Sequence, residues 1–148
     1  MSHDDLIARA RAAALRAYAP YSGFSVGCAV ESVDGEIVLG SNMENACYRL
    51  GVCAEVAALT AANQAFGLGR IARIAVAGGR VEGGALAGEQ IVTPCGGCRQ
   101  SILEAAQLSG LDLEIVCANG DGSAVDVRTI GALLPLSFGP DNLKDAAS

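Results

Sequence analysis

The chain has 148 residues, of which 51% are hydrophobic and 4% aromatic. This length predicts a single domain over residues 1–148. The formal net charge of -6, from 10 basic and 16 acidic residues, excludes the basic stripe typical of proteins that bind a nucleic acid polymer. The start is acidic, at Asp4 and Asp5, and every apolar stretch of spanning length contains polar residues, so we expect a cytoplasmic protein with no membrane partner.

The first predicted elements are a helix and a hairpin. Apolar residues recur on one side between Asp4 and Tyr18, Ser2 suits the N-cap, and Pro20 ends the helix. Two apolar, β-branched runs follow, and the Asp-Gly pair between them is typical of a tight turn. The predicted strands are Phe24 to Val33 and Glu36 to Gly40.

The rest of the chain predicts strands that alternate with helices. Val52 to Phe66 is apolar on nearly every face, so this helix is expected to be buried. The glycine-rich stretch from Gly78 to Gly88 is expected to be an exposed loop. Further elements are a central strand at Ile71 to Gly79, a helix at Gly96 to Leu108, strands at Leu111 to Ala118 and Val125 to Val127, and a helical turn from Thr129. The sum is an α/β fold with a mixed, roughly five-stranded sheet and helices on its faces.

Six cysteines are present, and in a reducing compartment metal binding or burial explains them better than disulfides do. Cys28 and Cys117 lie in strand-like runs and are predicted to be buried. Cys95 and Cys98 form a C-x-x-C pair at the start of a predicted helix, where exposed N–H groups favour thiolates. By itself this pair fits a redox dithiol, a structural zinc half-site or a catalytic one.

Cys53 and Glu55 favour the catalytic interpretation. Cys53 also opens a predicted helix, and Glu55 is the sole charged residue between Arg49 and Arg70. An unpaired buried carboxyl is costly unless function requires it. Three thiols with an open fourth position and a nearby base make up a zinc site that activates water. The alternatives are a Glu55 that only caps its helix, a dithiol oxidoreductase, and a closed structural zinc module with Cys47 as its fourth ligand.

These residues resemble the small, three-cysteine cytidine deaminases. Zinc deaminases carry the signature H-x-E…P-C-x-x-C, and Cys53 stands at the histidine position. The resemblance covers nearly the whole chain. Its other matching segments are Ala19 to Gly27, Asn42 to Ala46, Pro94 to Gln100, and Leu133 to Pro140.

The resemblance implies a three-layer α-β-α fold and the deamination of cytidine and deoxycytidine in pyrimidine salvage. Zn²⁺ on Cys53, Cys95 and Cys98 would activate a water that attacks C4, with Glu55 shuttling protons. The remaining implied substrate contacts are Phe24, Asn42 and Glu44 at the nucleoside, the backbone near Ala54 at the pyrimidine O2, and Phe138 from a neighbouring subunit.

The resemblance also implies a homotetramer with composite sites, in which Ala46 and Tyr48 lie at subunit contacts. One departure concerns Val56, because many relatives have Arg after the catalytic Glu. We expect the two helix N-termini, with Arg99, to compensate the thiolate charge instead. An aliphatic residue at this position also occurs in deaminases of modified cytosines such as blasticidin S, which are an alternative of the same chemistry.

Overall fold

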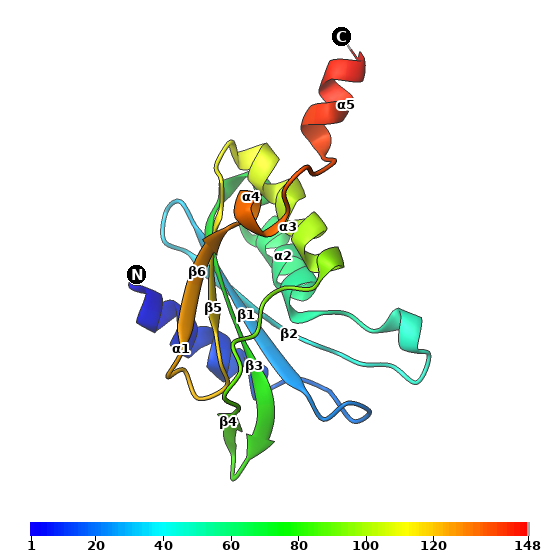
Figure 1. The fold of residues 1–148 in the computed structure, drawn as a ribbon. Helices are drawn as coiled ribbons and strands as arrows, with labels where there is room; N and C mark the ends of the chain where they lie inside the picture. The colour runs from blue at the N-terminus through cyan, green and yellow to red at the C-terminus, as the bar shows by residue number, and fades with distance from the viewer. Residues whose placement is uncertain (148) are drawn as a thin grey trace.

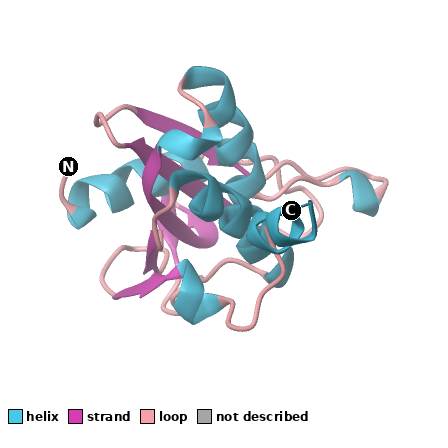
Figure 2. Ribbon diagram, turned by 90° about the horizontal axis from the view of Figure 1, so that it is seen from above, coloured by secondary structure: helices cyan, strands magenta, loops and turns pink. Residues whose placement is uncertain are grey.

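A mixed β-sheet forms the centre of the molecule and carries helices on both faces (Figures 1 and 2). The computed structural model describes residues 1–147. Within them the strands are β1 (Ser25–Ser32), β2 (Ile37–Ser41), β3 (Ile71–Glu82), β4 (Ala85–Ala87), β5 (Glu114–Ala118) and β6 (Val125–Thr129). The helices are α1 (His3–Ala14), η1 (Tyr48–Leu50), α2 (Ala54–Ala65), η2 (Leu68–Arg70), α3 (Gly96–Ser109), α4 (Ile130–Leu133) and α5 (Pro140–Ala147).

The strand order is β2-β1-β3-β5-β6, and β4 pairs with the end of β3. β3 and β5 run parallel, joined through α3, whereas the other pairs are antiparallel. The predicted mixed sheet is therefore confirmed, with six strands among the described residues because β4 adds one to the expected five.

Two hydrophobic layers cover the two faces of this sheet. Successive residues of a strand point to opposite faces, so Ala75 packs in the layer with α1 while Val76 packs in the layer with α2 and α3. Burial on both faces explains why β1 and β3 are almost continuously apolar. The three-layer α-β-α architecture is thus confirmed.

The first helix packs directly onto the sheet. A Cβ at Gly27 would lie 1.8 Å from the carbonyl oxygen of Ala10, so only glycine permits this approach. Ser2 caps the helix as predicted, because its Oγ accepts the N–H of Asp5 at 3.2 Å. The helix ends at Ala14 rather than Tyr18, whose backbone instead exchanges hydrogen bonds with residues 42 and 44.

Two expectations differ from the structure, and one helix was not predicted. The stretch from Gly78 to Gly88 is not simply a loop, since β3 continues to Glu82 and returns as β4 after Gly83 and Gly84, which both have positive φ. The tail after Gly139 forms α5, which projects from the body (Figure 1). The helix α2 buries one face only, because the face that carries Thr60 and Asn63 is exposed.

A long connection between β2 and α2 extends from the body as an arm, defined here as residues 42–53 (Figure 1). Met43 and Val52 pair across the base of the arm through hydrogen bonds of 3.0 and 2.9 Å. Tyr18 joins this base by accepting the N–H of Glu44. Within residues 1–147, none of the helices has the length and apolarity needed to cross a bilayer.

Candidate metal centre and active site

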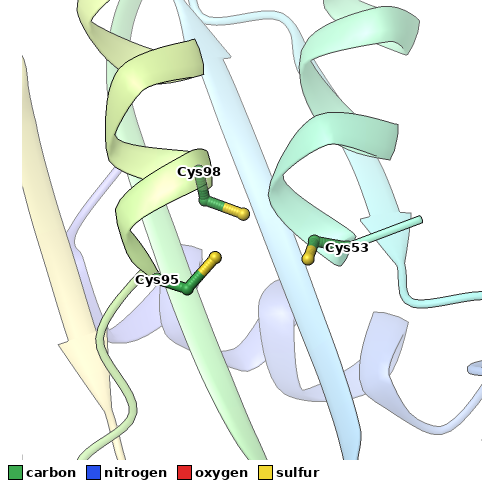
Figure 3. Close-up of side chains that lie close together, drawn as sticks. All are labelled: Cys53, Cys95 and Cys98. Carbon is green, nitrogen blue, oxygen red and sulfur yellow. The ribbon is translucent and has the colours of Figure 1, made fainter. Parts of the chain in front are cut away.

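Three cysteines meet where two helices begin. Cys53 directly precedes α2, Cys95 directly precedes α3, and Cys98 lies in the first turn of α3. Their sulfur atoms all lie within 4.8 Å of one another. Figure 3 shows the three side chains pointing toward one another from the ends of the two helices.

This donor set fits zinc. Zinc binds thiolates at about 2.3 Å in tetrahedral geometry, and catalytic sites use three protein ligands with one position left open. Cys47, the candidate fourth ligand of a closed site, lies on the exposed arm and does not belong to the cluster that the described residues form. The thiol arrangement therefore favours the open site over the closed one.

Backbone dipoles supply positive potential at the cluster. The N–H of Cys98 lowers the pKa of the Cys95 thiol, and the N–H of Gly97 adds to this effect. Burial raises the pKa of the Cys53 and Cys98 thiols. The expected role of the α3 N-terminus is consistent with the lowered pKa of Cys95.

Arg99 donates its hydrogen bonds to backbone carbonyls rather than to the thiols. Its guanidinium donates to the carbonyl oxygens of Pro94 and Leu133, both at 2.8 Å. The expectation that its charge compensates the thiolates stays a prediction. Val56 is half-buried and lines a cleft between α2 and α3 together with residues such as Ser101.

Glu55 occupies the second position of α2 and is 5% exposed. Burial raises the pKa of its carboxyl, and its own backbone N–H and the Cys98 thiol oppose this shift by hydrogen bonding. Within residues 1–147, no ion pair reaches this carboxyl. A buried carboxyl with a raised pKa, beside the thiol cluster, is suited to accept and return a proton.

Two further cysteines are buried in the sheet, as predicted. Cys28 in β1 and Cys117 in β5 are fully buried and flank Val76 across the sheet. Burial raises the pKa of the Cys117 thiol to about 11. Both side chains therefore behave as small apolar groups that support the helix ends.

A cavity of about 360 Å³ opens beside the cluster, within the size range of small-ligand sites. Phe24, Asn42, Glu44 and Ala54 line it, so the structure brings these predicted residues together with Glu55. Four lining residues were not predicted individually, namely Ser22, Val26, Val92 and Thr93. Ser22 falls within the segment from Ala19 to Gly27 that resembles the deaminases. Its place in the cavity could not be predicted individually, because it follows from a hydrogen bond with Glu44, which is distant in sequence.

Glu44 is held at the cavity by three donors. Its Oε1 accepts the N–H groups of Tyr21 and Ser22 at 3.0 and 3.1 Å, and its Oε2 accepts the Ser22 hydroxyl at 2.6 Å. The Ser22 hydroxyl, followed by the two N–H groups, lowers the pKa of the Glu44 carboxyl. A carboxylate has about four acceptor sites, so one remains for a ligand.

Asn42 joins the cavity to the start of β1. Its Oδ1 accepts the N–H of Val26 at 2.8 Å, and its Nδ2 donates to the carbonyl of Phe24 at 2.9 Å. One lone pair and one N–H of the amide remain available. The position is therefore more than the hairpin end that asparagine often occupies.

Phe138 does not reach the cavity of its own chain. It lies on the tail before α5, the residue is 63% exposed, and its neighbours include Gln100 and Leu143. Its contribution to a neighbouring subunit stays a prediction.

Comparison with known proteins reveals close relatives. Residues 1–109 match the family model described as the cytidine and deoxycytidylate deaminase zinc-binding region. The chain is 39% identical over 131 residues to a cytidine deaminase of Mycobacterium tuberculosis, covering 88% of this chain and 85% of that protein. It is 35% identical over 147 residues to that of Halalkalibacterium halodurans, covering 98% of this chain and all of the relative.

A solved structure shows the same relationship in three dimensions. The cytidine deaminase of Burkholderia pseudomallei superposes with a TM-score of 0.81 at 42% identity, over 93% of this chain and 100% of that chain. Sequence similarity, fold and thiol cluster agree, and the chain belongs to the cytidine and deoxycytidylate deaminase family.

Proposed function

We propose that this protein is a zinc-dependent hydrolase that converts cytidine and deoxycytidine, with water, into uridine or deoxyuridine and ammonia. The observation that carries this proposal is the three-sulfur cluster with the buried Glu55 carboxyl beside it in a nucleoside-sized cavity. Family membership supports it, because the relatives described above are cytidine deaminases.

Cys53, Cys95 and Cys98 would hold Zn²⁺ as thiolates, and the α3 N–H groups that lower the pKa of Cys95 favour this charged form. When bound, the ion supplies Lewis acidity, which lowers the pKa of a water molecule at the position that the protein leaves open.

Glu55 performs the proton transfers. Its carboxylate takes a proton from the attacking water as oxygen bonds to C4 of the pyrimidine, and returns it to the ring N3. The same carboxyl receives the second proton of that oxygen and delivers it to the amino group, which leaves as ammonia. A buried carboxyl with a raised pKa suits both directions, because proton transfer works best between groups of similar pKa.

The opposite end of the cavity binds the sugar. The unused acceptor of Glu44 and the free amide positions of Asn42 would hydrogen-bond the ribose 3'-hydroxyl. A phosphate there would be repelled by the Glu44 carboxylate, which favours a nucleoside over a nucleotide at this position. The backbone near Ala54 would hold the pyrimidine O2, and Phe24 would pack against the substrate.

The proposal extends to assembly and cellular role. Residues 1–148 form one deaminase domain, and four copies form a homotetramer in which Phe138 closes a neighbour's cavity. The exposed arm, with Ala46 and Tyr48, is a contact surface between these subunits. The enzyme works in pyrimidine salvage in the cytoplasm, where its thiol ligands stay reduced.

The direct test is ammonia release by the purified, zinc-loaded protein from cytidine, deoxycytidine and blasticidin S. We expect turnover of both cytosine nucleosides and little of blasticidin S. Faster turnover of blasticidin S would favour the related activity on modified cytosines. Zinc binding without turnover of any of the three would favour a structural module.

A further inference from the structure

Arg99 and Gln100, the two residues after Cys98, contact the C-terminal tail. Arg99 also contacts the segment of residues 93–95 that leads into the thiol cluster, here called the metal loop. Arg99 donates to the carbonyls of Pro94 and Leu133, and its third contact is the Thr93 hydroxyl at 3.3 Å. Thr93 and Pro94 directly precede Cys95, whereas Leu133 ends α4. One guanidinium therefore ties the segment that enters the thiol cluster to the segment from which the tail begins.

This contact also satisfies a helix end. The last carbonyl groups of a helix lack intrahelical partners, and an arginine can supply donors to them. Arg99 does this for Leu133 while its Nε holds Pro94. The planar guanidinium suits two acceptors at once, which a lysine ammonium on a flexible chain holds less rigidly.

Two glutamines of α3 form further hydrogen bonds with the backbone of the tail. Gln100 Nε2 donates to the carbonyl of Phe138 at 2.8 Å, and Gln107 Oε1 accepts the N–H of Asp141 at 2.9 Å. The two glutamines are seven residues apart, which is about two helical turns. A Cβ at Gly139 would lie 2.6 Å from Gln107 Oε1, so a larger residue there would displace the Gln107 amide that holds Asp141.

The backbone of Phe138 is thus fixed while its ring stays exposed. A side chain presented from a fixed backbone loses less conformational freedom when it enters a binding site. The helix that carries Cys98 therefore also fixes the direction in which the Phe138 side chain projects from the tail.

We propose that Arg99 and Gln100 are positioning residues that form a clamp, Gln100 by aiming Phe138 and Arg99 by holding both the tail and the metal loop. The functional part rests on the proposed role of Phe138 in a neighbouring cavity. The two residues have separable effects: loss of the Gln100 contact releases only the tail, whereas loss of the Arg99 contacts releases the tail and loosens zinc.

The test compares Gln100→Glu, Arg99→Lys and the control Glu104→Gln in the zinc-loaded, full-length protein. Glutamate is nearly isosteric with glutamine but cannot donate to the Phe138 carbonyl when ionised. Glu104 is exposed one turn further along α3 and beside the same tail. The measurements are hydrogen exchange of the peptide 134–142, zinc release to a chromogenic chelator, and kcat and KM for cytidine.

Gln100→Glu should accelerate tail exchange roughly fivefold, the effect of one lost hydrogen bond, and leave zinc release unchanged. Its KM should rise roughly three- to tenfold with kcat little changed, and the increase should vanish in a Phe138→Ala background. Arg99→Lys should accelerate both tail exchange and zinc release. The Glu104→Gln control should match the wild type in all three.

Unchanged tail exchange in Gln100→Glu and Arg99→Lys would overturn the clamp, whatever the kinetics. If Gln100→Glu raised KM equally in the wild-type and in the Phe138→Ala background, the positioning role would be overturned. A third result would also overturn that role: faster tail exchange in Gln100→Glu, combined with a wild-type KM in Phe138→Ala. In that case the clamp would exist, and the proposed contact of Phe138 with a neighbouring subunit would be wrong.

Discussion

Gly40 in β2 lies so close to α2 that a Cβ there would be 2.4 Å from the backbone nitrogen of Ala58 and 2.6 Å from the carbonyl oxygen of Ala54. The helix that positions Cys53 and Glu55 therefore rests on bare strand backbone. A methyl group at this point must displace the helix, because its nearest neighbours are backbone atoms rather than a flexible side chain end.

Gly40→Ala should destabilise the protein and disturb the metal centre. Overpacking of this kind costs roughly 1–3 kcal/mol, and the displacement reaches the first turn of α2. We expect a lower free energy of unfolding in denaturant titrations and faster zinc release. The matched control is Gly69→Ala, where the nearest atom would be 3.6 Å from the new Cβ and little change is expected. Equal effects of the two substitutions would contradict this account of the helix position.

The Cys53→Ser and Cys47→Ser variants separate the open from the closed metal site. Both cysteines are exposed and lie six residues apart, but only Cys53 belongs to the cluster. We expect Cys53→Ser to lose zinc during dialysis against a chelator, since serine is a poor ligand for this ion. Cys47→Ser should keep one zinc per chain and full activity. Loss of zinc in Cys47→Ser would instead support a closed site with four thiol ligands.

The sequence predicted most of the architecture because apolar periodicity and helix-opening residues are local signals. Cys53, Cys95 and Cys98 could be assigned to one site because Cys53 and the C-x-x-C pair lie at predicted helix starts and match the signature of the zinc deaminases. β4 was missed for a different reason. Gly83 and Gly84 signal a turn, but whether the chain after them pairs with β3 depends on contacts that are distant in sequence.

Other features were hidden by composition. The alanine-rich α2 lacks a strongly polar face, so its pattern predicted burial on all sides although Thr60 and Asn63 are exposed. The Arg99 charge suggested a partner for the thiolates, whereas the fold brings the carbonyl of Leu133 within its reach. Contacts with backbone carbonyls do not depend on which side chains the sequence carries, so the hydrogen bonds of Arg99 could not be predicted from the sequence.

Glu44→Gln should weaken substrate binding over a wide pH range. The Ser22 hydroxyl and two N–H groups lower the pKa of Glu44, so its carboxylate persists at pH values where an ordinary glutamate begins to protonate. Any stability or affinity that depends on the ionised form is present above the ordinary pKa and is lost as pH falls through the lowered folded-state pKa.

We expect KM for cytidine to rise roughly tenfold or more in Glu44→Gln, the effect of losing a hydrogen bond to a charged group. The ratio of mutant to wild-type KM should stay constant between about pH 5.5 and pH 8, because the wild-type carboxylate does not titrate there. Steady-state kinetics at several pH values measure this ratio. A ratio that falls toward unity already near pH 6 would show that the carboxylate is not held in its ionised form.

Mixed oligomers test whether Phe138 acts on a neighbouring subunit. Phe138→Ala alone should raise KM roughly three- to tenfold, through the loss of aromatic packing. When this variant is coexpressed with excess Glu55→Gln subunits, each intact Glu55 site can receive Phe138 from its neighbour. We expect the activity per Phe138→Ala subunit, at low cytidine concentration, to recover toward that of the wild type. Activity equal to that of Phe138→Ala alone would place the aromatic contact within one chain or exclude it.

We propose that the buried Glu55 carboxyl moves the protons of cytidine deamination and is not a zinc ligand. The most direct test of this proposal is the zinc content and cytidine turnover of Glu55→Gln, which keeps the size of the side chain and removes its acid-base function. We expect one zinc per chain, as in the wild type, and a kcat lower by at least roughly a hundredfold, the low end for a positioned acid-base group. Turnover at the wild-type rate with zinc in place would contradict it.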